Sequence, residues 1–164
     1  MASKGNTSLN KGIPVIRDAF VIIVKTEWNK HIVDKLEAGA INIFKQQNIG
    51  YKTLVVPGAV EIPFAIKAYA ESNQQQADAF IALGTVIRGD TPHFDYVCRY
   101  VTDGILLLNT KINAPSIFGV LTVNDEQQAL ERIGGIHGHK GEEAAITAIK
   151  MIALNRKLKR ILLQ

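Results

Sequence analysis

The sequence predicts an α/β fold: a three-layer α/β/α sandwich around a four-stranded parallel sheet, with an N-terminal arm. Three observations predict it. Apolar, β-branched runs alternate along the chain with longer segments of helical spacing. The runs are apolar at nearly every position, as in strands that are covered on both faces. The alternation itself is typical of parallel strands joined by crossover helices.

The predicted elements follow one another without a second domain. Residues 1–12 are expected to form a mobile tail, and residues 13–164 a single domain. Strands are predicted at 19–25, 51–56, 79–87 and 116–123, helices at 31–47, 59–72, 93–112, 124–134 and 140–163, and a break at 134–139. Right-handed crossovers restrict this order to the flavodoxin-like topology.

Local signals predict where several elements begin and end. Asn29 is a predicted N-cap of the first helix, and Gly50 is available for the left-handed position that follows it. Pro63 must lie in the first turn of the second helix, where its missing N–H costs little. Asn124 precedes Gln127 by three residues, which predicts a capping box.

Length and composition exclude several classes of protein. The chain has 164 residues, 47% hydrophobic and 21% charged, which suits a globular domain with a sizeable core. No apolar run is long enough to cross a bilayer, and the polar start lacks the core of a secretory signal, so we expect a cytoplasmic protein without membrane contact. The net charge of +4 is mild. No aromatic residues interleave with the basic cluster at 156–160, so we expect no nucleic-acid binding.

Cysteine and histidine are too sparse for a disulfide or a metal centre. Cys98 is the single cysteine, and its apolar helical spacing indicates a small core residue rather than a nucleophile. His137 and His139 lack a convincing metal-ligand spacing, since their side chains point differently in either regular structure.

Four loops should meet at one edge of the sheet, because ligands of such sheets bind beyond the carboxyl ends of the strands. They are residues 26–29, 57–61, 88–93 and 122–125. Trp28 is either a surface aromatic or a ring that stacks on an aromatic ligand. Glu61 is either a carboxylate favoured by a helix dipole or an acceptor for substrate hydroxyl or amino groups.

The loop at 88–93 leads into a helix that begins at His93. Free N–H groups at a helix start bind anions, although the carboxylate of Asp90 would oppose an anion unless it pointed away. The helix dipole favours a neutral His93, which could act as a base or be purely structural. Arg132 either complements a helix end or clamps a phosphate through two parallel hydrogen bonds. These residues indicate a pocket but name no reaction.

Four blocks of sequence carry a resemblance to a known family. They are VPGAVEIP (56–63), LGTVIRGDTPHFDYV (83–97), FGVLTVNDEQQALER (118–132) and GHKGEEAA (138–145), preceded by EWN (27–29). In order and spacing the chain closely resembles the lumazine synthases of riboflavin biosynthesis, over roughly residues 19 to 155. The blocks together are highly specific, whereas each alone is only suggestive.

The resemblance implies a reaction and an assembly. Lumazine synthases condense 5-amino-6-(D-ribitylamino)uracil with 3,4-dihydroxy-2-butanone 4-phosphate and release 6,7-dimethyl-8-(D-ribityl)lumazine, phosphate and water. They need no metal or organic cofactor. The resemblance implies a homo-oligomer, either a pentamer with active sites between neighbouring subunits or a 60-subunit icosahedral shell of pentamers. Riboflavin synthase is a further candidate partner.

The resemblance also implies roles for individual residues. His93 matches the proton-transfer residue, and Arg132 matches a phosphate-binding residue supplied by the adjacent subunit. The positions that match the substrate-binding segments are Trp28 for ring stacking, Ala59, Val60 and Glu61 for the ribityl chain, Thr85, Val86 and Ile87 for the pyrimidine, Asp90 and Thr91 for phosphate, and Phe118 from the adjacent subunit over the heterocycle. Lys140 matches a basic position without an assigned role.

Some positions depart from the family pattern or bear on the assembly. Asp90 stands where small residues are common, so we expect its phosphate contact through the backbone. In the family that the chain resembles, members that stop at pentamers often carry an insertion near this region. None separates Arg132 from Lys140, so the resemblance favours a shell over an isolated pentamer. Pro14 suits an arm that adds to a neighbour's sheet. Two other functions stay open: a non-catalytic flavin- or lumazine-binding protein, and a structural shell protein.

Overall fold

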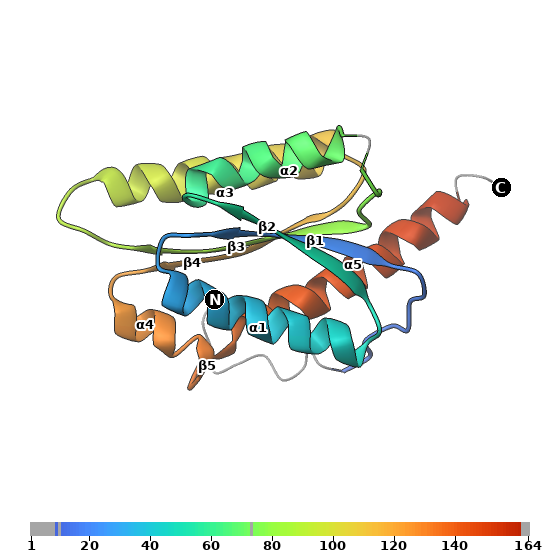
Figure 1. Ribbon diagram of the computed structural model, residues 1–164, viewed down its shortest axis with the longest axis horizontal. Helices are drawn as coiled ribbons and strands as arrows, with labels where there is room; N and C mark the ends of the chain where they lie inside the picture. The colour runs from blue at the N-terminus through green and yellow to red at the C-terminus, as the bar shows by residue number, and fades with distance from the viewer. Residues whose placement is uncertain (1–8, 10, 73, 162–164) are drawn as a thin grey trace.

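The protein is arranged in three layers, as the computed structural model shows for residues 9, 11–72 and 74–161 (Figure 1). The strands are β1 (Phe20–Thr26), β2 (Gly50–Val56), β3 (Ala79–Ile87) and β4 (Ser116–Val123), all parallel and in the order β2-β1-β3-β4. The helices are α1 (Lys30–Gln46), α2 (Ile62–Ala70), α3 (His93–Lys111), α4 (Glu126–Leu130) and α5 (Lys140–Ile161). Helices α2 and α3 cover one face of the sheet, and α1, α4 and α5 lie on the other (Figure 1). This arrangement confirms the predicted flavodoxin-like sandwich.

The central strands supply two separate cores from alternate residues. Val21 and Ile23 of β1 face the core under α1 and α5, whereas Ile22 and Val24 face the core under α2 and α3. All four are fully buried. Because successive side chains of a strand point to opposite faces, a strand covered on both sides must be apolar throughout. This explains the continuous apolar runs in the sequence.

Helices α1 and α5 pack backbone against backbone at one point. A Cβ atom added at Gly141 would lie 1.9 Å from the carbonyl oxygen of Leu36. Only a residue without a side chain allows this approach, because packed interiors leave no spare volume. Gly141 therefore has a packing role between the two helices.

The structure corrects the predicted ends of α1. Asn29 precedes the helix but forms no side-chain cap, because its own backbone is left-handed, with φ of 56°. At the other end Asn48, not Gly50, takes the left-handed position, also with φ of 56°. Gly50 is instead the first residue of β2. Asparagine adopts this conformation more readily than most residues, so it replaced the expected glycine. Pro63 lies in the first turn of α2, as predicted.

The segment after β4 also differs from the prediction. Asp125 caps α4 by accepting a hydrogen bond from the Gln128 N–H at 2.8 Å, so the cap lies one residue after the predicted Asn124. The Asn124 N–H is bonded instead to the Gln128 side chain at 3.0 Å. The helix ends at Leu130, earlier than the predicted end at residue 134. A small antiparallel hairpin of β5 (Ile133–Gly135) and β6 (Gly138–His139) takes up the end of the predicted helix and the predicted break.

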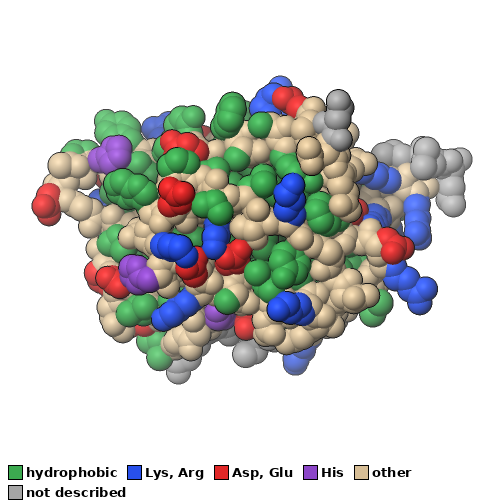
Figure 2. Space-filling view, viewed as in Figure 1, with side chains coloured by type: hydrophobic (Ala, Val, Ile, Leu, Met, Phe, Trp, Pro, Cys, Tyr) green, Lys and Arg blue, Asp and Glu red, His purple; other side chains and the backbone are tan. Residues whose placement is uncertain are grey.

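Cations of α5 hold the chain segment that leads into β1. Lys150 donates to the carbonyl oxygens of Leu9 at 2.6 Å and of Lys11 at 3.1 Å. Arg156 donates to the carbonyl of Arg17 at 2.7 Å and pairs with Asp78 at 2.9 Å. Basic side chains gather at the end of the molecule where α5 ends (Figure 2). Because it binds the Arg17 carbonyl and Asp78, Arg156 does more than complement the helix dipole. Of the tail predicted at 1–12, residues 1–8 and 10 lie outside the described residues.

Candidate active site

A cavity of about 460 Å³ opens at the carboxyl edge of the sheet, beyond the ends of β1, β2 and β3. It is lined by Thr26, Trp28, Asn29, Pro57, Gly58, Ala59, Val60, Glu61, Thr85, Val86, Ile87, Gly89, Thr91, His93, Phe94 and Val97. Three of the four loops expected to meet here do so. The fold therefore brings together the predicted residues at 28, 59–61, 85–87, 91 and 93.

One wall of the cavity is formed by residues that follow β1 and β2. The Trp28 side chain is 75% exposed, so its ring is available to a ligand rather than buried in the protein. The short 3-10 helix η1 (Ala59–Glu61) follows β2. One carboxylate oxygen of Glu61 accepts a hydrogen bond from the Gly58 N–H at 2.9 Å. A carboxylate has two oxygens with several acceptor sites, so Glu61 keeps capacity to bind a substrate hydroxyl.

Other residues of the cavity lining come from the end of β3 and the start of α3. The hydroxyl of Thr85 is buried and has no hydrogen-bond partner within the described residues. His93 is the first residue of α3, and its N–H donates to the Thr91 hydroxyl at 3.4 Å. Among the described residues Asp90 is exposed and does not line the cavity. The loop thus offers helix-start N–H groups and a histidine, while the Asp90 carboxylate stays outside the cavity lining.

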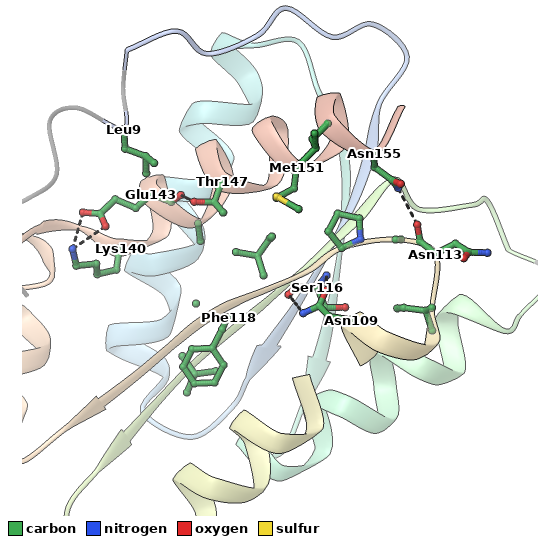
Figure 3. A pocket seen from close by; sticks show the side chains of 18 of the residues that line it. Leu9, Asn109, Asn113, Ser116, Phe118, Lys140, Glu143, Thr147, Met151 and Asn155 are labelled. Atoms are coloured by element: carbon green, nitrogen blue, oxygen red, sulfur yellow. Dashed lines mark hydrogen bonds and ion pairs between the residues drawn. The ribbon is translucent and has the colours of Figure 1, made fainter. Parts of the chain in front are cut away.

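The remaining predicted residues lie elsewhere on the chain. Phe118, 40% exposed, and Lys140 line a groove of about 1,090 Å³ between β4 and α5 (Figure 3). Lys140 forms an ion pair with both carboxylate oxygens of Glu143, at 2.7 and 2.8 Å. Arg132 lies after α4, where its guanidinium donates to the Gln128 carbonyl at 2.7 Å. Within one chain, Phe118 and Arg132 are not part of the cavity that holds His93.

Arg88 was not among the predicted site residues, yet it connects the start of α3 with the loop after β4. Its guanidinium lies 4.1 Å from the centroid of the Phe94 ring and 3.0 Å from Asp95, both in the first turn of α3. Its Nε donates to the Asn124 side chain at 3.2 Å, in the loop after β4. The clue in the sequence was a single arginine before the Gly89–Asp90 turn, which is too common a pattern to indicate this role.

Two further observations bear on the chemistry. Burial and the neighbouring Asp95 carboxylate raise the pKa of the Cys98 thiol, against an opposing effect of Arg88. Raised thiol pKa values do not suit a nucleophile. Over the described residues, no three His, Cys, Asp or Glu side chains are grouped to hold a metal ion.

No helix in the same part of the chain has both the length and the apolar character to cross a bilayer.

Comparison with known proteins assigns the family. Residues 18–156 match the family model for 6,7-dimethyl-8-ribityllumazine synthase. A protein of that name from Parabacteroides distasonis is 47% identical over 143 residues, which cover 85% of this chain and 88% of the relative. Its namesake from Porphyromonas gingivalis is 45% identical over 149 residues, covering 89% and 91%. A third, from Christiangramia forsetii, is 41% identical over 165 residues, covering 97% and 98%.

The family matched by sequence comparison agrees with the cavity at the carboxyl edge of the sheet. Membership implies small-molecule substrates and an assembly of several chains. The chain belongs to the 6,7-dimethyl-8-ribityllumazine synthase family and condenses 5-amino-6-(D-ribitylamino)uracil with 3,4-dihydroxy-2-butanone 4-phosphate, the penultimate step of riboflavin biosynthesis.

Proposed function

We propose that the condensation takes place in the cavity at the carboxyl edge of the sheet, completed by Phe118 and Arg132 of a neighbouring copy. The observation that carries this proposal is the separation of the predicted residues. The cavity contains Trp28, Glu61 and His93, whereas Phe118 lines a groove on another part of the chain. A head-to-tail ring joins such different surfaces at every interface. Each chain would then contribute its His93 cavity to one site and its Phe118 and Arg132 to the site of the adjacent subunit.

The binding roles follow from the position of each group. The exposed Trp28 ring stacks on the pyrimidine, because aromatic rings stack well in offset arrangements. Glu61 accepts hydrogen bonds from the ribityl hydroxyls, with Ala59 and Val60 beside the same chain. Thr85, Val86 and Ile87 contact the pyrimidine edge. The phosphate lies at the start of α3, against Thr91 and the backbone of Asp90.

The mechanism uses proximity and proton transfer. The amine of the pyrimidine attacks the ketone of the phosphosugar, and loss of water gives an imine. His93 then removes a proton as phosphate leaves, while Arg132 of the neighbouring copy and the helix-start N–H groups stabilise the departing anion. The enol tautomerises, the ribityl-bearing nitrogen closes the ring, and water is expelled. Holding both substrates in one site contributes up to about 7–11 kcal/mol to the barrier reduction.

We propose further that the ring is a pentamer and that pentamers assemble into a 60-subunit shell. The support for the shell is the hairpin of β5 and β6, which joins Arg132 to Lys140 directly and leaves no insertion between them. We also propose a cytoplasmic enzyme that hands its product to riboflavin synthase. Native mass spectrometry tests the subunit number, and co-purification tests the partner. A homogeneous pentamer with no larger species would contradict the shell.

Mixing two defective variants tests the shared site. His93→Ala and Arg132→Ala subunits would be co-expressed and assayed for lumazine formation at low phosphosugar concentration. In a mixed ring a site regains both groups wherever an Arg132→Ala subunit precedes a His93→Ala subunit, which happens at about a quarter of the interfaces for equal random mixing. The control combines His93→Ala with Glu61→Ala. Both changes fall in the half-site that a single chain supplies, so every site in this mixture lacks one of the two groups.

The mixing experiment separates this proposal from its rivals. Recovery in the first mixture beyond that of the control supports a site built from two chains. Equal activity in both mixtures contradicts it and indicates that each chain carries a whole site. Turnover by the wild-type assembly also separates the enzyme from a non-catalytic lumazine-binding protein or a shell protein, neither of which would form product.

A further inference from the structure

We propose that Asn29 is a positioning residue that holds Trp28 over the substrate cavity through a hydrogen bond to the end of β3. The inference rests on the proposed function in one respect, the stacking of Trp28 on the pyrimidine. The anchoring itself is a property of the substrate-free protein. The sequence predicted that Asn29 is a helix cap, and the proposal gives this residue a different role.

The side chain of Asn29 binds the neighbouring strand β3 instead of capping its own helix. Its amide nitrogen donates to the carbonyl oxygen of Thr85 at 2.8 Å, so the loop after β1 is joined to the carboxyl end of β3. Its backbone is left-handed, with φ of 56°, and it lines the same cavity as Trp28. Asparagine tolerates this conformation better than most residues, and the bond to Thr85 fixes its side chain at the cavity.

The backbone of Trp28 is fixed on both sides. Its N–H donates to the carbonyl of Pro57 at 3.2 Å, and its carbonyl accepts from the hydroxyl of Thr26 at 3.1 Å. Thr26 is buried, and Gly84 gives it room, since a Cβ atom at Gly84 would lie 3.1 Å from the Thr26 methyl carbon. The three bonds tie this loop to β1, to the end of β2 and, through Asn29, to β3.

These bonds matter because the ring itself is mostly outside the protein. With a side chain 75% exposed, Trp28 gains little orientation from packing. The direction of the ring is then set by its backbone, and the Asn29 bond is the link that ties the loop to the strand beneath the pyrimidine. Pre-organisation of this kind lowers the entropy cost of binding.

Two substitutions remove the bond while keeping the backbone conformation. Asn29→Asp keeps the shape and tolerates a left-handed backbone, but its carboxylate cannot donate to the Thr85 carbonyl. Asn29→Gly adopts the left-handed conformation without cost and has no side chain. Asn48 provides matched controls, since it has the same φ of 56° at the other end of α1 and is exposed. Asn48→Asp and Asn48→Gly repeat the same chemical changes away from the cavity.

The single tryptophan makes the anchoring directly measurable. Time-resolved fluorescence anisotropy of the substrate-free assembled enzyme reports the motion of the Trp28 ring. We expect a clear gain in fast ring motion in both Asn29 variants and none in the Asn48 variants. Steady-state kinetics should show a rise of about five- to tenfold in the KM for the ribitylaminouracil, the loss expected for one hydrogen bond. The KM for the phosphosugar and kcat should stay close to wild type.

The two readouts separate the possible failures. Unchanged anisotropy in Asn29→Asp, or an equal gain in Asn48→Asp, would overturn the anchoring whatever the kinetics. A fall in kcat at constant KM would also overturn it, because general destabilisation lowers the active fraction and not the affinity. Trp28→Ala tests the proposed function separately: an unchanged KM for the pyrimidine would contradict the stacking role, and the anisotropy would still decide on Asn29.

Discussion

The central carbon of the Arg88 guanidinium lies over the ring of Phe94, 4.1 Å from the ring centroid. It also meets the carboxylate of Asp95 at 3.0 Å and the side-chain oxygen of Asn124 at 3.2 Å. Phe94 follows His93 directly and lines the cavity beside it. Arg88 therefore fixes the first turn of α3 against the loop after β4, and with it the backbone of the histidine.

Arg88→Ala should lower kcat about tenfold, a loss in the range of one cation–π contact together with a charge-assisted hydrogen bond. Arg88→Lys should restore less than half of that loss, because an ammonium keeps the charge but not the planar fork. Steady-state assays of lumazine formation measure both. Arg99→Ala is the control, since Arg99 pairs with Asp103 on the same helix at 3.6 Å and is largely exposed. An equal loss in the control would contradict a local role for Arg88.

His93→Ala and Arg132→Ala should fail in different ways. Removal of the proton-transfer group should lower kcat about 10²- to 10⁴-fold and leave weak residual activity, because the substrates are still held together. Arg132→Ala should instead raise the KM for the phosphosugar, since it removes a phosphate clamp. Kinetics that are unchanged in both variants would remove the assignment of these residues.

Gly141→Ala should destabilise the protein through its backbone contact with Leu36. The added methyl group would have to displace the α1 backbone, and such overpacking costs about 1–3 kcal/mol or more. Thermal unfolding should show a clearly lower Tm for the assembled protein. Gly89→Ala serves as the control, because a Cβ atom there meets nothing within 4 Å. A Tm equal to that of the control would mean that α1 and α5 are less tightly joined than the structure indicates.

Cys98 should react slowly with iodoacetamide at neutral pH. Burial and the Asp95 carboxylate raise the pKa of its thiol, so the reactive thiolate is scarcer than in a free cysteine at pH 7–8. The thiolate becomes the major form only when the pH exceeds this raised pKa. Because Arg88 opposes this shift, Arg88→Ala should slow the reaction further. Alkylation rates followed by mass spectrometry between pH 7 and 10 test both statements. Fast alkylation at pH 7 would contradict them.

Much of the fold and half of the site followed from the sequence. The strands β3 and β4 have the predicted ends, because a strand buried on both faces leaves a continuous apolar run. The loops at the carboxyl edge were predictable for the same reason, since parallel strands bring them together. The cavity therefore holds nearly all the residues predicted for one chain.

What the sequence did not reveal depends on contacts between distant segments. Nothing local distinguishes Asp125 from Asn124 as the cap of α4, because both side chains can accept the hydrogen bond. The hairpin at 133–139 is too short for a periodic pattern. Asn29 was predicted to be a helix cap because its actual partner, Thr85, lies 56 positions away along the chain and no local pattern indicates that bond. Arg88 was missed for the same reason, since its partner Asn124 lies on another loop.

The separation of the His93 cavity from the groove of Phe118 and Lys140 has a consequence for how the enzyme responds to dilution. Under the proposed role, a dissociated chain holds two incomplete half-sites and turns over no substrate. Specific activity should then depend on protein concentration and fall steeply once subunits separate. Catalysis in this enzyme would report its own state of assembly, and an agent that splits the ring would act as an inhibitor without entering the cavity.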